Sequence, residues 1–204
     1  MNPPKKNLNL AKVLKVGYKN EKTQNKVLGK YGYQMDKPLS NDNQQVYYNP
    51  KDKKLLVNIT GTHNTRDVGT DAYLALGNLK GTNRYKEADK VLQQAKAKYD
   101  EDIVVLSGHS LGGSIAQGIG KPTDKVYTLN SGYTIGQKTK STQNNYRTSG
   151  DAVSLLGAGS NNLKTVGKEP TLFQSFAKGG LIGLAKNALA SHTPKTIKGE
   201  NIFV

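Results

Sequence analysis

The stretch VVLSGHSLGGSIAQ, residues 104–117, combines three features in fourteen positions. Residues 103–106 form an uninterrupted apolar run that is rich in β-branched side chains, as expected for a strand buried on both faces. A glycine-rich turn follows, and after it apolar residues recur at helical spacing, at Leu111, Ile115 and Ile119. The stretch therefore predicts a strand, a very tight turn and a helix, which is the building unit of an α/β fold.

Ser110 stands at the centre of this turn, between Gly108 and Gly112. So tight a turn strains the backbone of its central residue and brings the positions two residues away into collision, which glycine relieves. The serine hydroxyl is then lifted clear of the sheet, in front of the first N–H groups of the helix. Because the chain has 22 glycines, chance occurrence of the G-x-S-x-G pattern is the alternative. The flanking strand and helix patterns favour a nucleophile.

The composition is that of one compact domain. With 204 residues, 35% apolar residues and a mean hydropathy of −0.64, we expect a single domain over 1–204 and no membrane span. No apolar segment of the signal-peptide kind follows the charged start. The absence of cysteine excludes disulfides and thiolate metal sites, and we expect neither a metal nor another cofactor. These features favour an intracellular or virus-associated protein over a secreted one.

The formal net charge of +15 comes almost entirely from lysine, since all but three of the 30 basic residues are lysine. Arginine is the residue that reads bases and phosphates in bidentate fashion, so nucleic acid is an improbable partner. A solvated surface or an anionic membrane surface explains the charge better.

Local patterns predict the order of elements along the chain. Residues 1–44 read as an extra basic N-terminal arm with weak helical patterning. Two β-rich runs, 45–48 and 55–60, flank a turn and predict a hairpin. A helix is expected over 85–99, capped by Thr82 or Asn83. Further strands are expected at 125–130 and 144–151, and a helix at 173–190. This alternation predicts a mostly parallel sheet, with a site at the carboxyl ends of its strands.

A nucleophilic serine needs a base, and three histidines are available. In folds with a nucleophile elbow the chain order is serine, acid, histidine, and only His192 follows Ser110. We expect His109, the variable position of the elbow, to be a packed or hydrogen-bonded histidine. His63 precedes the serine and is a candidate neighbour of the site.

Three acids lie between Ser110 and His192. Asp124 precedes a predicted strand and so belongs at the wrong end of the sheet, and Glu169 precedes a proline in a loop. Asp151 follows a predicted strand, where a short acid reaches the imidazole. We therefore predict Asp151 as the acid, with a capping role toward Val153 as the alternative.

The oxyanion of an acyl-transfer intermediate needs hydrogen-bond donors. The backbone N–H of Leu111 is supplied by the elbow itself. Thr62, after the strand that ends in Gly61, offers an N–H and a hydroxyl, with an ordinary polar turn as the alternative.

Three segments in this order resemble the lipase class 3 family of α/β-hydrolases: TGTHNTRDVGTD (60–71), VVLSGHSLGGSIA (104–116) and SGDAVSLL (149–156). The resemblance covers roughly residues 45–192. It implies an α/β-hydrolase-like three-layer fold with a mostly parallel central sheet. It further implies an ester hydrolase that works through an acyl-enzyme, with Ser110 as nucleophile, Asp151 as acid, His192 as base, and Thr62 and Leu111 as the oxyanion hole.

The sequence departs from the family at the segment after the oxyanion residue. Thr60 replaces the usual basic residue, Val68 the usual tryptophan, and residues 63–70 are polar apart from Val68. An esterase or phospholipase without interfacial opening fits better than a lipase with an apolar lid. A catalytically silent binding or structural protein on the same fold is the alternative.

Residues 172–192 bear on the partner of the protein. Their apolar positions gather near one face with lysines opposite, as in a helix that lies on a membrane surface. A core helix that packs on the sheet and carries His192 explains the same pattern. The expected partner is a lipid or another carboxylic ester.

Overall fold

The computed structural model describes residues 7–62, 77–100, 103–133, 139–154, 162–167, 170, 174, 177–178, 190–197 and 202–204. Within these residues, seven strands form one sheet in the order β1-β2-β3-β4-β5-β6-β7. Their bounds are β1 Gln34–Met35, β2 Gln44–Asn49, β3 Lys54–Ile59, β4 Ile103–His109, β5 Lys125–Leu129, β6 Gln143–Thr148 and β7 Leu163–Val166. β1, β2 and β3 pair antiparallel, and β3 to β7 pair parallel. The predicted mostly parallel sheet is therefore confirmed.

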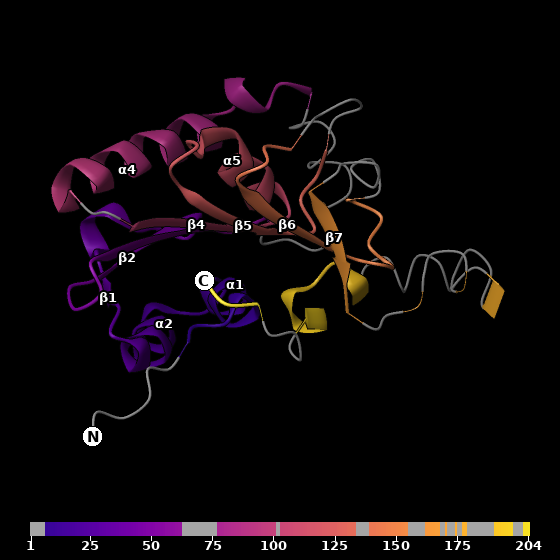
Figure 1. Ribbon diagram of the computed structural model, residues 1–204, viewed down its shortest axis with the longest axis horizontal. Helices are drawn as coiled ribbons and strands as arrows, with labels where there is room; N and C mark the ends of the chain where they lie inside the picture. The colour runs from indigo at the N-terminus through magenta and orange to yellow at the C-terminus, as the bar shows by residue number, and fades with distance from the viewer. Residues whose placement is uncertain are drawn as a thin grey trace.

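Helices cover both faces of this sheet. α4 and α5 lie on one face, and α1 and α2 on the other, as Figure 1 shows. The helices described are α1 Leu10–Gly17, α2 Glu21–Leu28, α4 Asn83–Tyr99 and α5 Leu111–Ile119, with short 3-10 turns η1 Gly29–Tyr31, η2 Lys37–Leu39, η3 Leu79–Gly81 and η5 Pro194–Ile197. The α/β-hydrolase-like three-layer architecture follows from this arrangement.

Strand β4 is buried on both of its faces, as its continuous apolar run predicts. Val104 and Leu106 pack in the cluster beneath α4 and α5. Val105, pointing the other way, packs with Leu56 and with Val13 of α1. Side chains of a strand alternate between the two faces of a sheet, so an apolar run with no alternation requires a layer on each side.

The predicted hairpin is present as β2 and β3, whose pairing extends to Asn49 opposite Lys54. The Asn49 side chain accepts the backbone N–H groups of Lys51 and Asp52, at 3.1 and 3.2 Å, and so closes the turn. Lys53 takes a positive φ of 47° within this turn.

Helix α4 begins where its capping residue predicts. The Thr82 hydroxyl accepts the N–H of Tyr85 at 3.2 Å, so Thr82 rather than Asn83 is the cap. The helix buries one apolar stripe against the sheet, composed of Ala88, Val91, Leu92 and Ala95.

Within the described part of the basic arm, residues 7–44, α1 and α2 form the layer beneath the sheet and β1 is the edge strand of the sheet. Asn9 caps α1 by accepting the N–H of Ala11 at 2.9 Å. Leu10 and Leu14 pack against Leu129 of the sheet and Ile197 of η5. The arm thus joins the sheet to the segment that follows His192.

Several predictions fall on residues outside those described. They concern His63, Val68 and the rest of the family-like segment 60–71 after Thr62, as well as Glu169 and most of the predicted helix at 173–190. In the part of the chain that the structure describes, no helix has the length and apolarity needed to cross a bilayer.

Candidate active site

Ser110 occupies the turn between β4 and α5, with a φ of 57° and a ψ of −129°. Positive φ is rare for a residue with a side chain and marks a strained turn. The flanking glycines permit it. A Cβ on Gly108 would lie 2.4 Å from the carbonyl oxygen of Gly112, and a Cβ on Gly112 would lie 2.2 Å from that of Ile59. The sequence therefore places glycine where the elbow has no room for a side chain.

His192 lies between Ser110 and Asp151, although each of these is distant from it in sequence. Its Nε2 is 2.8 Å from the Ser110 Oγ, and its Nδ1 is 2.6 Å from Oδ1 of Asp151. All three side chains are buried, Asp151 completely. The structure thus brings together the three residues that the sequence analysis singled out.

Asp151 sits in a turn after β6 and receives hydrogen bonds at both carboxylate oxygens. Ser154 donates its N–H to Oδ2 at 2.8 Å, and Val153 donates to Oδ1 at 3.4 Å. Because both oxygens of the Asp151 carboxylate accept backbone N–H groups, the carboxylate also acts as the acceptor toward His192. Nδ1 of His192 therefore carries the ring proton, and Nε2 accepts a hydrogen bond from the serine hydroxyl. The capping role considered as an alternative therefore coexists with the contact to His192.

Asp124, the second candidate acid, lies elsewhere. It precedes β5, is 4% exposed, and accepts two hydrogen bonds from Nζ of Lys96, at 2.6 and 2.8 Å. Its position at the amino end of a parallel strand is the one that the sequence order indicated. Glu169 lies outside the described residues.

The main chain at His192 is held from the carboxyl ends of three neighbouring strands. Thr148 at the end of β6 donates its hydroxyl to the Ser191 carbonyl at 2.6 Å, and Asn130, directly after β5, donates its amide to the same carbonyl at 2.9 Å. Nε2 of His109, at the end of β4, lies 2.5 Å from the His192 carbonyl. Two successive carbonyls of this segment are thus fixed.

His109 is neutral in this arrangement. Burial, followed by the proximity of His192, lowers the pKa of His109 from 6.5 to about 3. A carbonyl only accepts hydrogen bonds, so Nε2 of His109 donates and Nδ1 accepts. The rings of His109 and His192 lie 4.9 Å apart, centroid to centroid. A neutral His109 leaves His192 free of like-charge repulsion when His192 takes up a proton.

Tyr18 completes this network from the layer beneath the sheet, and no sequence pattern predicted its role. Its hydroxyl lies 2.8 Å from Nδ1 of His109 and accepts the N–H of Gly61 at 2.7 Å. Because Nδ1 accepts, the Tyr18 hydroxyl donates to it. Burial raises the pKa of Tyr18 to about 12. Tyr18 follows α1 and lies 91 residues from His109, and no local pattern distinguishes it from the other ten tyrosines.

Of the two predicted oxyanion residues, Leu111 follows Ser110 directly, and Thr62 follows Gly61, which packs against the elbow. Leu111 is the first residue of α5, so its N–H has no acceptor within the helix. Gly61 approaches the serine so closely that a Cβ on it would lie 2.8 Å from the Ser110 Cβ. Thr62, which is half-buried, follows directly. Among the described residues, no group of three or more His, Cys, Asp or Glu side chains is placed to hold a metal.

Comparison with known proteins identifies the fold of the chain, but it identifies no family to which the chain belongs. No family model matches the chain, and no curated protein matches it. Among solved structures, Lip2 lipase from Yarrowia lipolytica is similar with a TM-score of 0.59 and 15% identity, over 90% of this chain and 89% of that one. At this identity the likeness shows a lipase-like α/β-hydrolase fold.

Two further fungal lipase structures are more distant. Rhizomucor miehei lipase, in complex with its propeptide, is 13% identical with a TM-score of 0.46, over 72% of this chain and 61% of that one. MDLA from Penicillium cyclopium is 15% identical with a TM-score of 0.41, over 72% of this chain and 69% of that one.

Proposed function

We propose that the protein is a serine ester hydrolase that cleaves a lipid or another carboxylic ester through an acyl-enzyme. The observation that carries this proposal is the hydrogen-bonded series from Ser110 Oγ to His192 to Asp151, at 2.8 and 2.6 Å, at a strained elbow. Nucleophile, base and orienting acid within hydrogen-bond reach are the signature of an activated serine.

In the proposed reaction, Oγ of Ser110 attacks the ester carbonyl carbon while its proton passes to Nε2 of His192. The Asp151 carboxylate accepts the Nδ1–H and stabilises the imidazolium. The negative charge moves to the carbonyl oxygen, and in this proposal the N–H of Leu111 and the donors of Thr62 bind that oxygen. When the intermediate collapses, the alcohol leaves with the proton from His192. Water then repeats these steps on the acyl-serine and releases the carboxylic acid.

The neighbours of the triad support this chemistry. A positively charged His192 forms in each half-reaction, beside a His109 ring that burial keeps neutral. The carbonyls of Ser191 and His192 are anchored to strand ends, so the imidazole is held in place before substrate arrives. Preorganisation of this kind lowers the cost of reaching the transition state.

Labelling with a fluorophosphonate probe, together with hydrolysis of p-nitrophenyl butyrate, tests the proposal. Wild type should be labelled and active. Ser110→Ala should lose the label and lower kcat by a factor of about 10⁴ or more, because triad members act as a unit. Ser107→Ala is the matched control: it is a buried serine of β4 whose hydroxyl donates to Oδ1 of Asn58 at 2.8 Å. A folded wild type with neither label nor activity would favour the silent binding protein instead.

A further inference from the structure

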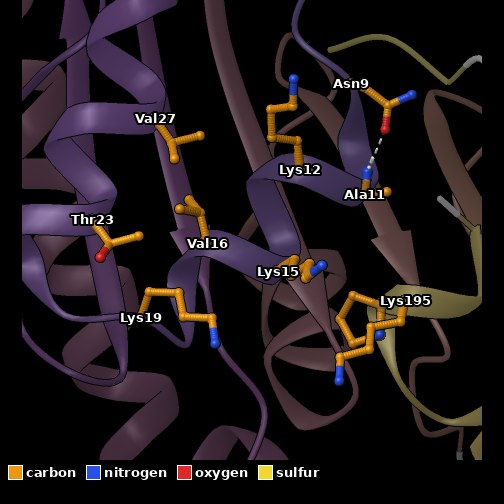
Figure 2. Close-up of a pocket in the computed structure, with 10 residues that line it drawn as sticks. Asn9, Ala11, Lys12, Lys15, Val16, Lys19, Thr23, Val27 and Lys195 are labelled. Carbon is orange, nitrogen blue, oxygen red and sulfur yellow. Dashed lines mark hydrogen bonds between the residues drawn. The ribbon is translucent and has the colours of Figure 1, made fainter.

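A cavity of about 520 Å³ lies beneath the sheet, between α1, α2 and η5. Figure 2 shows its lining. The lining comes from α1, α2 and η5 and combines lysine side chains with small apolar ones. This cavity is outside the triad, and none of its lining residues takes part in the proposed reaction.

The charged part of the lining has one sign. Lys12, Lys15 and Lys19 follow one another along α1 and just beyond it, and Lys195 reaches the cavity from η5. None of the described residues that line the cavity is acidic. The Lys12 ammonium group donates a hydrogen bond to the Tyr31 hydroxyl and lies over the Tyr31 ring. Among the described residues, Lys15, Lys19 and Lys195 form no ion pair, and Glu21 of α2 pairs instead with Lys37 at 3.2 Å. Such convergence of like charges in a concave site raises the local concentration of anions.

The floor of the cavity is apolar. Ala11 and Val16 are 6% and 5% exposed, and Val27 and Pro194 are half-buried beside them. In Figure 2, Val16 and Val27 lie between α1 and α2, Lys15 and Lys19 lie to the right of and below Val16, and Lys195 lies beyond Lys15. An apolar floor with a cationic rim fits a ligand that has a hydrocarbon part and an anionic head. A volume of about 520 Å³ is typical of sites for a small molecule, and it suits one alkyl chain better than the two chains of a phospholipid.

From these features we infer that the cavity binds a single-chain carboxylate of the fatty-acid type. The hydrocarbon chain of this ligand lies over Ala11, Val16 and Val27, and its carboxylate lies among Lys15, Lys19 and Lys195. This binding does not require Ser110 to be reactive, so it stands apart from the proposed hydrolysis. The ligand nevertheless belongs to the same chemical class as the acid that such a hydrolysis releases.

Fluorescence titration of the full chain with dansylaminoundecanoate, displaced by dodecanoate, tests the inference. Wild type should bind the probe, and added salt should weaken the binding. Lys15→Gln/Lys19→Gln/Lys195→Gln should raise the Kd about tenfold, since each exposed ion pair contributes a few-fold at most. The matched control is Lys86→Gln/Lys90→Gln/Lys121→Gln. It removes three exposed lysines in or beside α4 and α5 on the other face of the sheet, and should change the Kd less than about twofold.

Two further arms test the shape of the ligand and its location. Dodecanol, which lacks the charge, should displace the probe at least about tenfold less well than dodecanoate. Val27→Trp should abolish binding by filling the cavity, and its circular dichroism spectrum shows whether it is folded. Hydrolysis of p-nitrophenyl butyrate is measured on the same variants. A variant that loses probe binding and keeps this activity bears on the cavity alone, whereas a wild type without activity bears on the proposed hydrolysis alone.

Two results would overturn the inference. One is probe binding that survives both the lysine triple variant and a folded Val27→Trp, which would place the ligand elsewhere, for example at Ser110. The other is sedimentation with phosphatidylglycerol vesicles that the lysine triple variant abolishes, without any binding of free dodecanoate. That result would make the cavity rim a membrane contact.

Discussion

His109 ties the stability of the fold to pH. Its pKa is about 3 in the folded chain, against about 6.5 when exposed, so between these values the unfolded chain binds a proton that the folded chain does not. The stabilisation that a neutral His109 contributes to the folded chain is therefore complete above about pH 6.5 and is lost as the pH falls toward about 3. Over that window the free energy of unfolding should fall by up to about 1.4 kcal/mol per pH unit on account of this residue.

Urea unfolding of wild type and His109→Gln measures this effect. The variant lacks the ring contacts with Tyr18 and the His192 carbonyl, so it should be less stable than wild type near neutral pH. Because it also lacks the titrating group, the difference in stability should narrow as the solution is acidified from about pH 7 to about pH 5. Parallel pH dependences of the two proteins would show that the pKa of His109 is the same in the folded and the unfolded chain, against this prediction.

Asp151 and Asp124 are both buried acids that follow Ser110, but only Asp151 contacts the base. Asp151→Asn should lower kcat by about 10⁴-fold, because an amide in this position favours the wrong tautomer of His192. Asp124→Asn breaks the ion pair with Lys96, so it should lower the melting temperature and leave kcat of the folded protein near wild type. Kinetics of both variants below their melting temperatures separate the two effects, and full activity in Asp151→Asn would refute the assignment of the acid.

At the scale of an element, the C-terminal end of α1 reaches the site through Tyr18. Tyr18→Phe removes an acceptor for the Gly61 N–H and a donor to His109, leaving two buried groups unpaired. We expect a loss of about 1–3 kcal/mol in stability and a lower kcat, because both the oxyanion segment and the anchor of His192 are loosened.

Tyr47→Phe is the matched control for this effect. The Tyr47 hydroxyl is also buried and donates to Oε1 of Gln24 at 2.7 Å, on the same face of the sheet. Its removal should cost similar stability without changing kcat. Equal kcat losses in the two variants would mean that Tyr18 acts on activity only through the general stability of the fold.

The sequence predicted the elements whose signals are local. Gly108 and Gly112 identify the elbow, and the unbroken run before Ser110 indicates a strand covered on both sides. Thr82, one of the two predicted caps of α4, accepts the N–H of Tyr85. The contacts of Tyr18 with His109 and of Thr148 with Ser191 join residues 91 and 43 positions apart. Such contacts depend on how layers and strand ends come together, and no residue spacing in the sequence records them.

At the scale of the whole molecule, strand order explains why an N-terminal layer is required. From β3 to β7 the strands follow one another in sequence order, and the described helices α4 and α5 that connect them lie on one face. The other face, which includes Leu56, Val105 and Leu129, is left for α1 and α2 to cover. The lysines of α1 point away from the sheet, while Leu10, Val13 and Leu14 are buried against it. A strongly basic segment thus supplies part of the core.

A chain that begins at residue 45 tests this role, because it keeps the region that resembles a hydrolase and lacks β1, α1 and α2. Full burial of a large apolar side chain contributes about 1.5–3 kcal/mol, so exposing this face should cost more than the whole stability of a typical domain. We expect the shortened chain to bind the dye ANS, to aggregate and to lack ester hydrolysis, whereas a chain that begins at residue 7 should melt cooperatively like the full one. The measurements are ANS fluorescence, calorimetric melting and activity on p-nitrophenyl butyrate. Cooperative melting together with full activity in the chain from residue 45 would show that residues 1–44 are dispensable to both core and site.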